Sequence, residues 1–128
     1  MSGGQFPWGT GTVLTKGKNY KVKKISINPN SRQSYQMHNQ RAESWVILSG
    51  NGKITIDDEE TEVSTAAIVL IPIQTKHRIE NVSDTEALVF IETQFGAVID
   101  EHDIVRFEDD YGRCRHNWTR EDDAELYD

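Results

Sequence analysis

The sequence predicts an all-β domain, and three features of the chain lead to this prediction. Apolar residues occur in short runs, several of which alternate with polar residues in the period of two expected for a strand. Turn-forming residues separate these runs at spacings of about 8 to 12 residues, as in sandwiches and barrels. Up to Gln94 no window has the periodicity of an amphipathic helix. We therefore predict a sandwich or barrel that forms a single domain over residues 1–113.

The first half of the chain contains four predicted strands. The run Asn-Pro-Asn-Ser at residues 28–31 predicts a turn between the second and the third of them. The run Ser-Gly-Asn-Gly at residues 49–52 predicts a hairpin turn after the fourth, because these residue types tolerate positive φ. The strands are expected at Val13–Thr15, Tyr20–Asn28, Ser34–His38 and Trp45–Leu48.

The second half contains four more predicted strands and a different C-terminal extension. Turns are expected at residues 57–60 and 81–84, where acidic and small polar residues gather. The segment Asp100–Phe107 is interpreted as a short helix capped by Asp100 or Asp103, and residues 114–128 as a polar tail. The strands are expected at Lys53–Asp57, Ala67–Ile71, His77–Val82 and Ala87–Thr93.

Composition limits the classes of function. The chain has 128 residues and a net charge of −7, which argues against nucleic acid as the main partner. No stretch approaches the roughly 20 apolar residues of a membrane span, so no membrane association is expected. The start of the chain lacks the pattern of a signal peptide, and Cys114 is a single cysteine, so we expect a cytoplasmic protein without an internal disulfide.

Four residues in two distant segments have the character of a metal site. Gln36 and His38 share one face of a predicted strand, since side chains alternate along it. Glu43 begins the next strand, and His77 follows a Pro-containing turn later in the chain. The expected cofactor is one divalent metal ion, Zn, Mn, Fe, Co or Ni, held by Gln36, His38, Glu43 and His77. With only one anionic ligand, the ion keeps positive charge for Lewis-acid chemistry.

Several polar residues of these segments also have structural interpretations. A buried glutamine such as Gln36 can also serve by hydrogen bonding to the backbone. Asn81 is interpreted as a residue of a turn or strand end, and His102 and His116 as packed or surface histidines that bind no metal.

These two segments resemble the two motifs of the cupins. The first motif usually reads His-x-His, three or four residues, Glu, six residues, Gly; this chain has Gln36, His38, Glu43 and Gly50. The second usually reads Pro-x-Gly, two residues, His, three residues, Asn; this chain has Pro72, Gln74, His77 and Asn81. The resemblance implies a cupin double-stranded β-helix, or jelly-roll, barrel with a short helical or irregular C-terminal extension.

Longer segments resemble the C-terminal domain of type II mannose-6-phosphate isomerases, which is often fused to mannose-1-phosphate guanylyltransferase. The run Asp103–Arg113 is the longest of them. The family usually has further histidines where this chain has Asn39, Gln40 and Ser44. The other segments are Pro7–Gly9, Tyr20–Lys23, Gln36–His38, Arg41–Glu43, Trp45, Lys76–Arg78 and Glu80–Asn81.

The resemblance implies a metal-dependent isomerase that interconverts mannose 6-phosphate and fructose 6-phosphate by proton transfer through an enediol. Arg41 and Glu92 are the candidate catalytic residues, since Arg41 lies between two ligand strands and Glu92 interrupts an apolar strand. The alternatives are a surface arginine for Arg41 and a structural hydrogen-bonding role for Glu92. Lys23, Arg78 and Arg106 are candidates for binding the sugar phosphate, and the alternative for each is a solvated surface charge.

Two alternatives remain open for the function. One is a non-catalytic cupin that binds a sugar or a nucleotide sugar, and the other is a small metal oxygenase. The resemblance to small cupins, which often dimerise by packing sheet against sheet, also implies a homodimer. In such a dimer the N-terminal residues 6–8 could cover the sheet edge of a neighbour.

Overall fold

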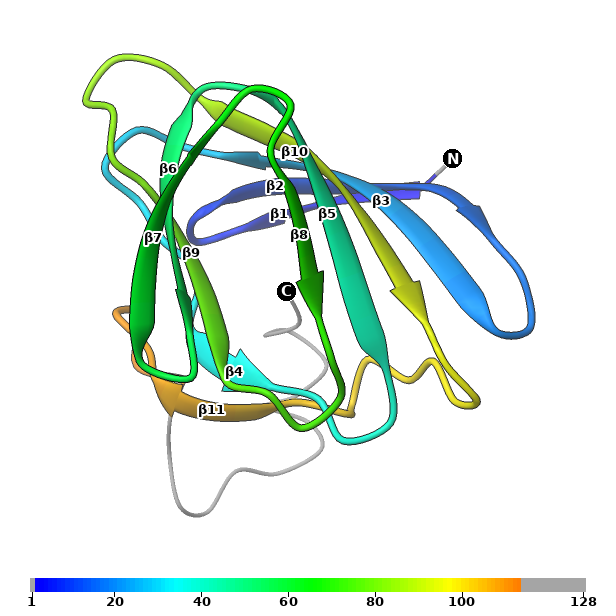
Figure 1. Ribbon diagram of the computed structural model, residues 1–128. Coiled ribbons are helices and arrows are strands. Elements are labelled where there is room, and N and C mark those ends of the chain that lie inside the picture. The colour runs from blue at the N-terminus through cyan, green and yellow to red at the C-terminus, as the bar shows by residue number, and fades with distance from the viewer. Residues whose placement is uncertain (1, 114–128) are drawn as a thin grey trace.

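The computed structural model describes residues 2–113, and its strands form two antiparallel sheets (Figure 1). Within this part of the chain there is no helix, so none is long and apolar enough to cross a membrane. The all-β prediction is confirmed. The strands are β1 (Ser2–Phe6), β2 (Gly9–Lys16), β3 (Tyr20–Ile27), β4 (Tyr35–Met37), β5 (Ala42–Ser49), β6 (Asn51–Ile56), β7 (Glu59–Ser64), β8 (Ile68–Ile71), β9 (His77–Asn81), β10 (Leu88–Phe95) and β11 (Val105–Glu108).

The two sheets face each other across one core. The larger sheet has the order β1-β2-β3-β10-β5-β8, and the smaller has the order β11-β4-β9-β6-β7. Strand neighbours in both sheets come from distant parts of the sequence, as β3 and β10 do (Figure 1). Burial of apolar side chains from both sheets is the main stabilising term, at about 25 cal/mol for each Å² removed from water. The core comprises Trp8, Ile25, Ile27, Trp45, Ile47, Ile54, Val69, Ile71, Ile79, Leu88 and Phe90.

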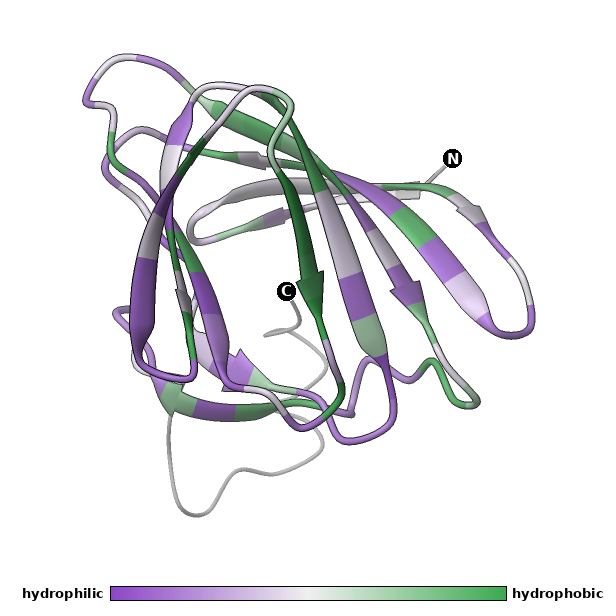
Figure 2. Cartoon of the chain, viewed as in Figure 1, coloured by the Kyte–Doolittle hydropathy of each residue, from purple (hydrophilic) through white to green (hydrophobic). Residues whose placement is uncertain are grey.

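The inner face of the larger sheet changes from apolar to polar along its strands. Ile25 and Phe90 are cross-strand partners in the apolar part, and Lys23 and Glu92 are partners one inward-facing step further along. All four are buried. The hydropathy colouring shows polar residues at the corresponding ends of β3, β5 and β10 (Figure 2). One half of the interior thus provides the core, and the other half can provide chemistry.

All eight predicted strands occur, and three further strands, β1, β7 and β11, were not predicted. Strand β7 carries three glutamates and lies at the edge of the smaller sheet. Its residues have little apolar alternation, so their sequence does not predict a strand. Charged side chains suit a sheet edge, since they discourage pairing with other chains.

The predicted helix at Asp100–Phe107 is wrong. Residues 101–102 form a turn, and Val105–Glu108 form β11, which pairs with β4. Local sequence favoured a helix start at Asp100, but pairing with a strand about 70 residues away satisfies the backbone instead. The extension predicted after the barrel is therefore a strand of the barrel itself over these residues.

The predicted hairpin at residues 49–52 is also wrong in its pairing. Gly50 has φ of 98°, which confirms the need for glycine, and a Cβ there would lie 2.7 Å from the carbonyl oxygen of Ala87. The chain turns, but β5 and β6 belong to different sheets. The turn therefore carries the chain from one sheet to the other.

The N-terminal aromatic residues pack on their own barrel. Trp8 is completely buried in the core, and the Phe6 ring stacks on it with centroids 5.0 Å apart. Residues 6–8 therefore pack within their own chain, and the contact of this segment with a neighbour stays a prediction. Residues 114–128, predicted as a polar tail, lie outside the described residues, as do Cys114 and His116.

Candidate metal centre

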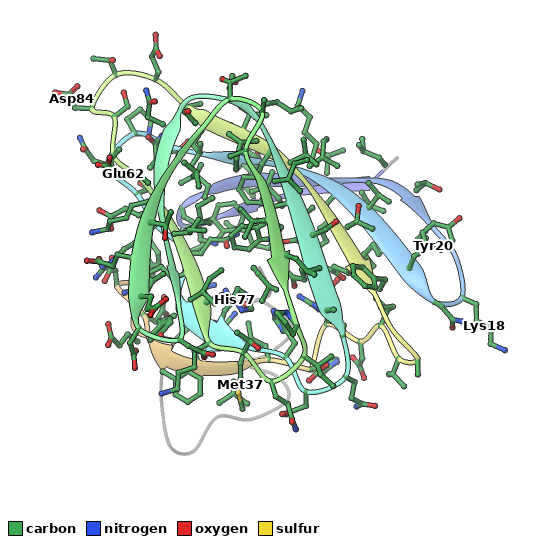
Figure 3. The ribbon with its side chains drawn as sticks, in the orientation of Figure 1. Lys18, Tyr20, Met37, Glu62, His77 and Asp84 are labelled. Atoms are coloured by element: carbon green, nitrogen blue, oxygen red, sulfur yellow. The ribbon has the colours of Figure 1, made fainter. Side chains whose placement is uncertain are left out.

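His38, Glu43 and His77 converge inside the polar half of the barrel. His38 directly follows β4, Glu43 lies in β5 and His77 begins β9. Their side chains are 2 to 3% exposed, and one possible ligand atom from each lies within 4.8 Å of the others. His38 Nε2 and Glu43 Oε2 are 3.1 Å apart. Figure 3 shows His77 in the space between the two sheets.

Hydrogen bonds orient both imidazole rings for metal binding. His38 Nδ1 donates to the carbonyl oxygen of Asp103 at 2.6 Å, and His77 Nδ1 donates to that of Thr75 at 2.9 Å. Since a carbonyl accepts only, the proton of each neutral ring lies on Nδ1 and the lone pair lies on Nε2. Histidine ligands of metals usually make this second hydrogen bond, which fixes tautomer and orientation. The observed donors therefore fit a divalent ion.

Burial keeps His77 in the neutral form that a ligand needs. Desolvation lowers the pKa of His77 to about 4, although the nearby Glu43 carboxylate acts in the opposite direction. At neutral pH no proton competes for its Nε2.

Gln36 lies on the same face of the smaller sheet as His77. The two residues are direct cross-strand partners, and Gln36 is 2% exposed. Its Nε2 donates to Ser34 Oγ at 3.1 Å. Gln36 is thus positioned beside the three converging side chains, and its amide also has the local hydrogen bonding that the alternative reading expected.

Glu43 is ionised despite complete burial. Burial by itself raises the pKa of Glu43, but the Arg41 guanidinium, together with the contact to His38, holds the pKa well below its usual range. Arg41 Nη2 lies 2.9 Å from Glu43 Oε2, and the indole Nε1 of Trp45 donates to Glu43 Oε1 at 3.0 Å. The carboxylate is therefore fixed at both oxygens.

Arg41 contacts two of the candidate ligands. Its Nη2 also lies 3.2 Å from His38 Nε2, so the guanidinium donates to the lone pair that a metal would use. A metal ion bound by His38 and Glu43 requires Arg41 to withdraw from the His38 nitrogen. Arg41 then remains beside the centre as a positive group.

Glu92 is a buried acid on the same interior face. It pairs across the larger sheet with Lys23 on one side and Trp45 on the other, and Gln94 Nε2 donates to its Oε2 at 2.8 Å. Burial, together with the negative charge of Glu43, raises the pKa of Glu92 to about 8. A carboxyl group with this pKa can both accept and release a proton near neutral pH.

The three predicted phosphate contacts occupy different places. Lys23 lies on the inner face of β3, and Arg106 is the direct cross-strand partner of Gln36, so both are buried on the side of the candidate centre. Arg78 follows His77 in β9 and therefore points to the opposite face. There its Nε donates to the carbonyl oxygen of Gln33. The prediction that Arg78 contacts a substrate at this centre does not fit that position.

Sequence reasoning missed the acidic residues of the segment that precedes β11. The Asp103 carboxylate accepts the backbone N–H groups of Asn39 and Gln40 at 2.7 and 2.8 Å. Glu101 pairs with Lys21 and with Lys23, whose Nζ lies 3.4 Å from Glu101 Oε1. No spacing in the sequence relates these residues, which are separated by more than 60 positions.

The departures from the cupin and isomerase patterns leave the buried cluster intact. Asn39 and Gln40 are exposed, and the loop is held through their backbone. Ser44 lies between inward-facing Glu43 and Trp45, so its side chain points to the outer face of the sheet. Gln74, in the place of the usual glycine, has φ of 56°, a left-handed conformation that glycine adopts with least strain.

Asn81 and His102 have the structural roles expected of them. Asn81 Nδ2 donates to the carbonyl oxygens of Ile27 and Glu86, and its Oδ1 accepts from the Ser83 backbone. Asn81 thus ties the end of β9 to its surroundings. His102 hydrogen bonds to Asp100 on a partly exposed segment.

Comparisons with known proteins relate the whole barrel to one family. The family model described as Mannose-6-phosphate isomerase C-terminal matches residues 4–109. The chain is 43% identical over 107 residues to a mannose-1-phosphate guanylyltransferase of Salmonella montevideo, a match that covers 84% of this chain and 22% of the relative. The chain therefore spans less than a quarter of the length of that curated relative.

Solved structures agree on the fold. The cupin domain of Schizosaccharomyces pombe Cnp3 superposes with a TM-score of 0.65 at 15% identity, covering 68% of this chain and 64% of that one. A protein of Acidithiobacillus ferrooxidans, for which a sugar phosphate isomerase activity has been suggested, has a TM-score of 0.53 and 28% identity, covering 59% and 50%. The predicted cupin barrel is confirmed.

Proposed function

Because this chain belongs to the mannose-6-phosphate isomerase C-terminal family, we propose that it is a metal-dependent isomerase that interconverts mannose 6-phosphate and fructose 6-phosphate. The observation that carries the proposal is the convergence of the two imidazole Nε2 atoms and the Glu43 carboxylate in a buried, polar part of the barrel. The Nδ1 hydrogen bonds to backbone carbonyls support the use of these nitrogens as ligands.

The proposed ligands are His38, Glu43 and His77, with Gln36 as the fourth. Two imidazoles, a carboxylate and an amide oxygen suit Zn, Mn, Fe, Co or Ni. When bound, such an ion supplies positive charge that stabilises an oxyanion next to the carbon that loses its proton.

The remaining residues would position the sugar and move the proton. Glu92 is proposed as the acid–base group, because its raised pKa lets it take a proton from one carbon and return it to the neighbouring one. Arg41, once withdrawn from His38, would lie near the substrate oxyanion and provide a second positive charge beside it.

A non-catalytic cupin that binds a sugar or nucleotide sugar is the second candidate. The specific observation in its favour is that Arg41 already satisfies His38 Nε2 and Glu43 Oε2, so the cluster can be stable without an ion. The relatives are named for guanylyltransferase activity, and this chain matches only a part of them.

A coupled assay with mannose 6-phosphate separates the two candidates. Protein purified without chelator should convert mannose 6-phosphate to fructose 6-phosphate, lose that activity with a chelator and regain it with one of the five proposed ions. Binding of the sugar phosphate without turnover, whichever ion is added, would leave only the non-catalytic candidate.

The homodimer is proposed through the outer face of β5 and β8. Ile68 and Leu70 are 76% and 62% exposed, and Val46 and Leu48 are also exposed beside them. Figure 2 shows β8 as hydrophobic along its length, and β8 is an edge strand. A contiguous apolar surface of this kind suits association with a second copy.

Sedimentation equilibrium tests this contact. The wild type should sediment as a dimer, and Ile68→Lys combined with Leu70→Lys should give a folded monomer. Lys24→Glu, a charge change on an exposed position of the same sheet, should leave the dimer intact. A dimer that survives the double substitution would place the contact elsewhere.

A further inference from the structure

The inner face of the larger sheet presents three polar residues in one row across adjacent strands. Lys21 of β3 is the cross-strand partner of Gln94 of β10, and Gln94 is the partner of Glu43 of β5. Cross-strand partners place their side chains on the same face. Neighbouring strands lie about 4.8 Å apart, so the backbones at Lys21 and Glu43 are about 10 Å apart. The row therefore joins the candidate metal ligands to a positively charged end.

The positively charged end is occupied by a carboxylate of the same chain. Lys21 and Lys23 both pair with Glu101 Oε1. The side chains of the two lysines are only 16% and 7% exposed, so they are held at the interior rather than spread in solvent. Glu101 belongs to the segment between β10 and β11, and it is a carboxylate placed where an anionic ligand would bind.

Gln94 between the two ends has an unsatisfied acceptor. Its side chain is completely buried, and Nε2 donates to Glu92 Oε2. Among the described residues no donor reaches its Oε1. Buried polar atoms without a hydrogen bond are rare in folded proteins and call for an explanation such as a bound group. A hydroxyl of a ligand lying along the row would donate to this oxygen.

We propose that Lys21 and Lys23 form the phosphate subsite of this centre, that Glu101 fills it in the empty protein, and that Gln94 binds a hydroxyl of the substrate between phosphate and metal. This rests on the proposed function and names its substrate class: a sugar whose phosphate and carbonyl are at opposite ends. The phosphate displaces Glu101 from both lysines, and two charge-assisted contacts to its oxygens replace those to the carboxylate.

Glu101 is suited to leave when an anion arrives. Asp103 holds the adjoining turn through the Asn39 and Gln40 backbone and through His38, so the ligand cluster keeps its support when Glu101 moves. The segment on the other side of Glu101 begins with Gly96, which hydrogen bonds to the carbonyl oxygen of Asn19. Displacement is therefore a local change between two fixed points.

Calorimetric titration of the full chain with inorganic phosphate, after removal of metal by a chelator, tests the subsite without reference to activity. Lys21→Met and Lys23→Met should each weaken phosphate binding at least about tenfold, and Glu101→Gln should strengthen it by a similar factor. Because Glu101→Gln acts in the opposite direction, a failure to fold cannot imitate the full pattern. Unchanged affinity in Glu101→Gln, or in both lysine variants, would overturn the proposal.

Matched controls separate the local effect from net charge. Lys24→Met removes the same charge from the exposed face of β3, and Asp100→Asn removes a negative charge next to Glu101. Both should leave the phosphate affinity of the wild type unchanged. If Lys24→Met weakens binding as much as Lys21→Met does, the subsite assignment fails.

Mannose 6-phosphate distinguishes the role of Gln94. In the metal-free protein it should bind more tightly than inorganic phosphate, and Gln94→Leu should remove that difference while leaving the affinity for phosphate itself. Equal loss for both ligands would contradict contact with a sugar hydroxyl.

The isomerase assay on the same proteins separates this inference from the function on which it rests. Turnover with an unchanged KM in Lys21→Met would support the proposed isomerase activity and contradict the proposed phosphate subsite. If the variants change phosphate affinity as expected but the wild type shows no turnover, the phosphate subsite is supported and the isomerase activity is contradicted.

Discussion

His38→Ala should abolish both metal content and isomerase activity while leaving a folded barrel. His38 provides an Nε2 atom fixed by the Asp103 carbonyl and located 3.1 Å from Glu43 Oε2. Alanine removes one of two nitrogen donors. Without the ion, the transition state loses several kcal/mol of stabilisation, which corresponds to at least about a 10³-fold fall in kcat/KM.

Metal analysis of protein purified without chelator gives the direct measurement. The wild type should contain about one ion for each chain, and His38→Ala should contain almost none. His102→Ala is the matched control, because His102 is partly exposed and hydrogen bonds to the neighbouring Asp100. Retention of full activity in His38→Ala would leave the proposed centre without support.

Glu92→Gln should lose most of the activity but keep the metal. The substitution preserves size and a polar contact for Gln94, whereas it removes the group proposed to transfer the proton. General acid–base groups contribute about 10²- to 10⁴-fold, and we expect a fall in kcat within that range. Loss of metal together with activity would instead indicate a structural role for Glu92.

The pH dependence gives a second test of Glu92. Its pKa is raised to about 8 in the folded protein, so the ionised form needed by a base increases as the pH approaches that value. The activity of the wild type should rise from about pH 6 to about pH 8, and the residual activity of Glu92→Gln should lack this rise.

The free energy of unfolding of the wild type should fall as the pH rises, whereas its activity should increase. The unfolded chain ionises Glu92 near pH 4.5, but the metal-free native state retains the proton up to about pH 8. The native state therefore binds more protons in this interval, and its free energy of unfolding falls as the pH rises. In denaturant unfolding, the free energy of unfolding of Glu92→Gln should increase relative to that of the wild type as the pH rises through this range, by on the order of a few kcal/mol. Equal pH dependence of both proteins would contradict the raised pKa.

The sequence was sufficient for much of the barrel and for the main site residues. Strand periodicity and turn residues predicted eight strands, and motif spacing selected His38, Glu43 and His77, which do converge. Strand periodicity and turn residues depend on neighbouring residues in the sequence, and the motif spacing depends on the length of one strand. Their physical basis is the alternation of side chains and the positive φ at positions such as Gly50.

The features that sequence reasoning missed depend on contacts between distant segments. Strand β11 forms because β4 offers unpaired backbone groups, although its local sequence favoured a helix. Arg41 beside His38 Nε2, and Glu101 beside the two lysines, are set by how the two sheets and the connecting segment meet. Arg78 could have been assigned to the outer face from its position next to His77.

The division of the barrel interior into an apolar half and a polar half has a consequence for how such domains can diversify. Residues such as Ile25, Ile47 and Phe90 maintain the fold at one end, so replacement of side chains at the other end need not unfold the chain. Substitutions at a few inward-facing positions can then change the reaction that such a barrel catalyses without changing its fold.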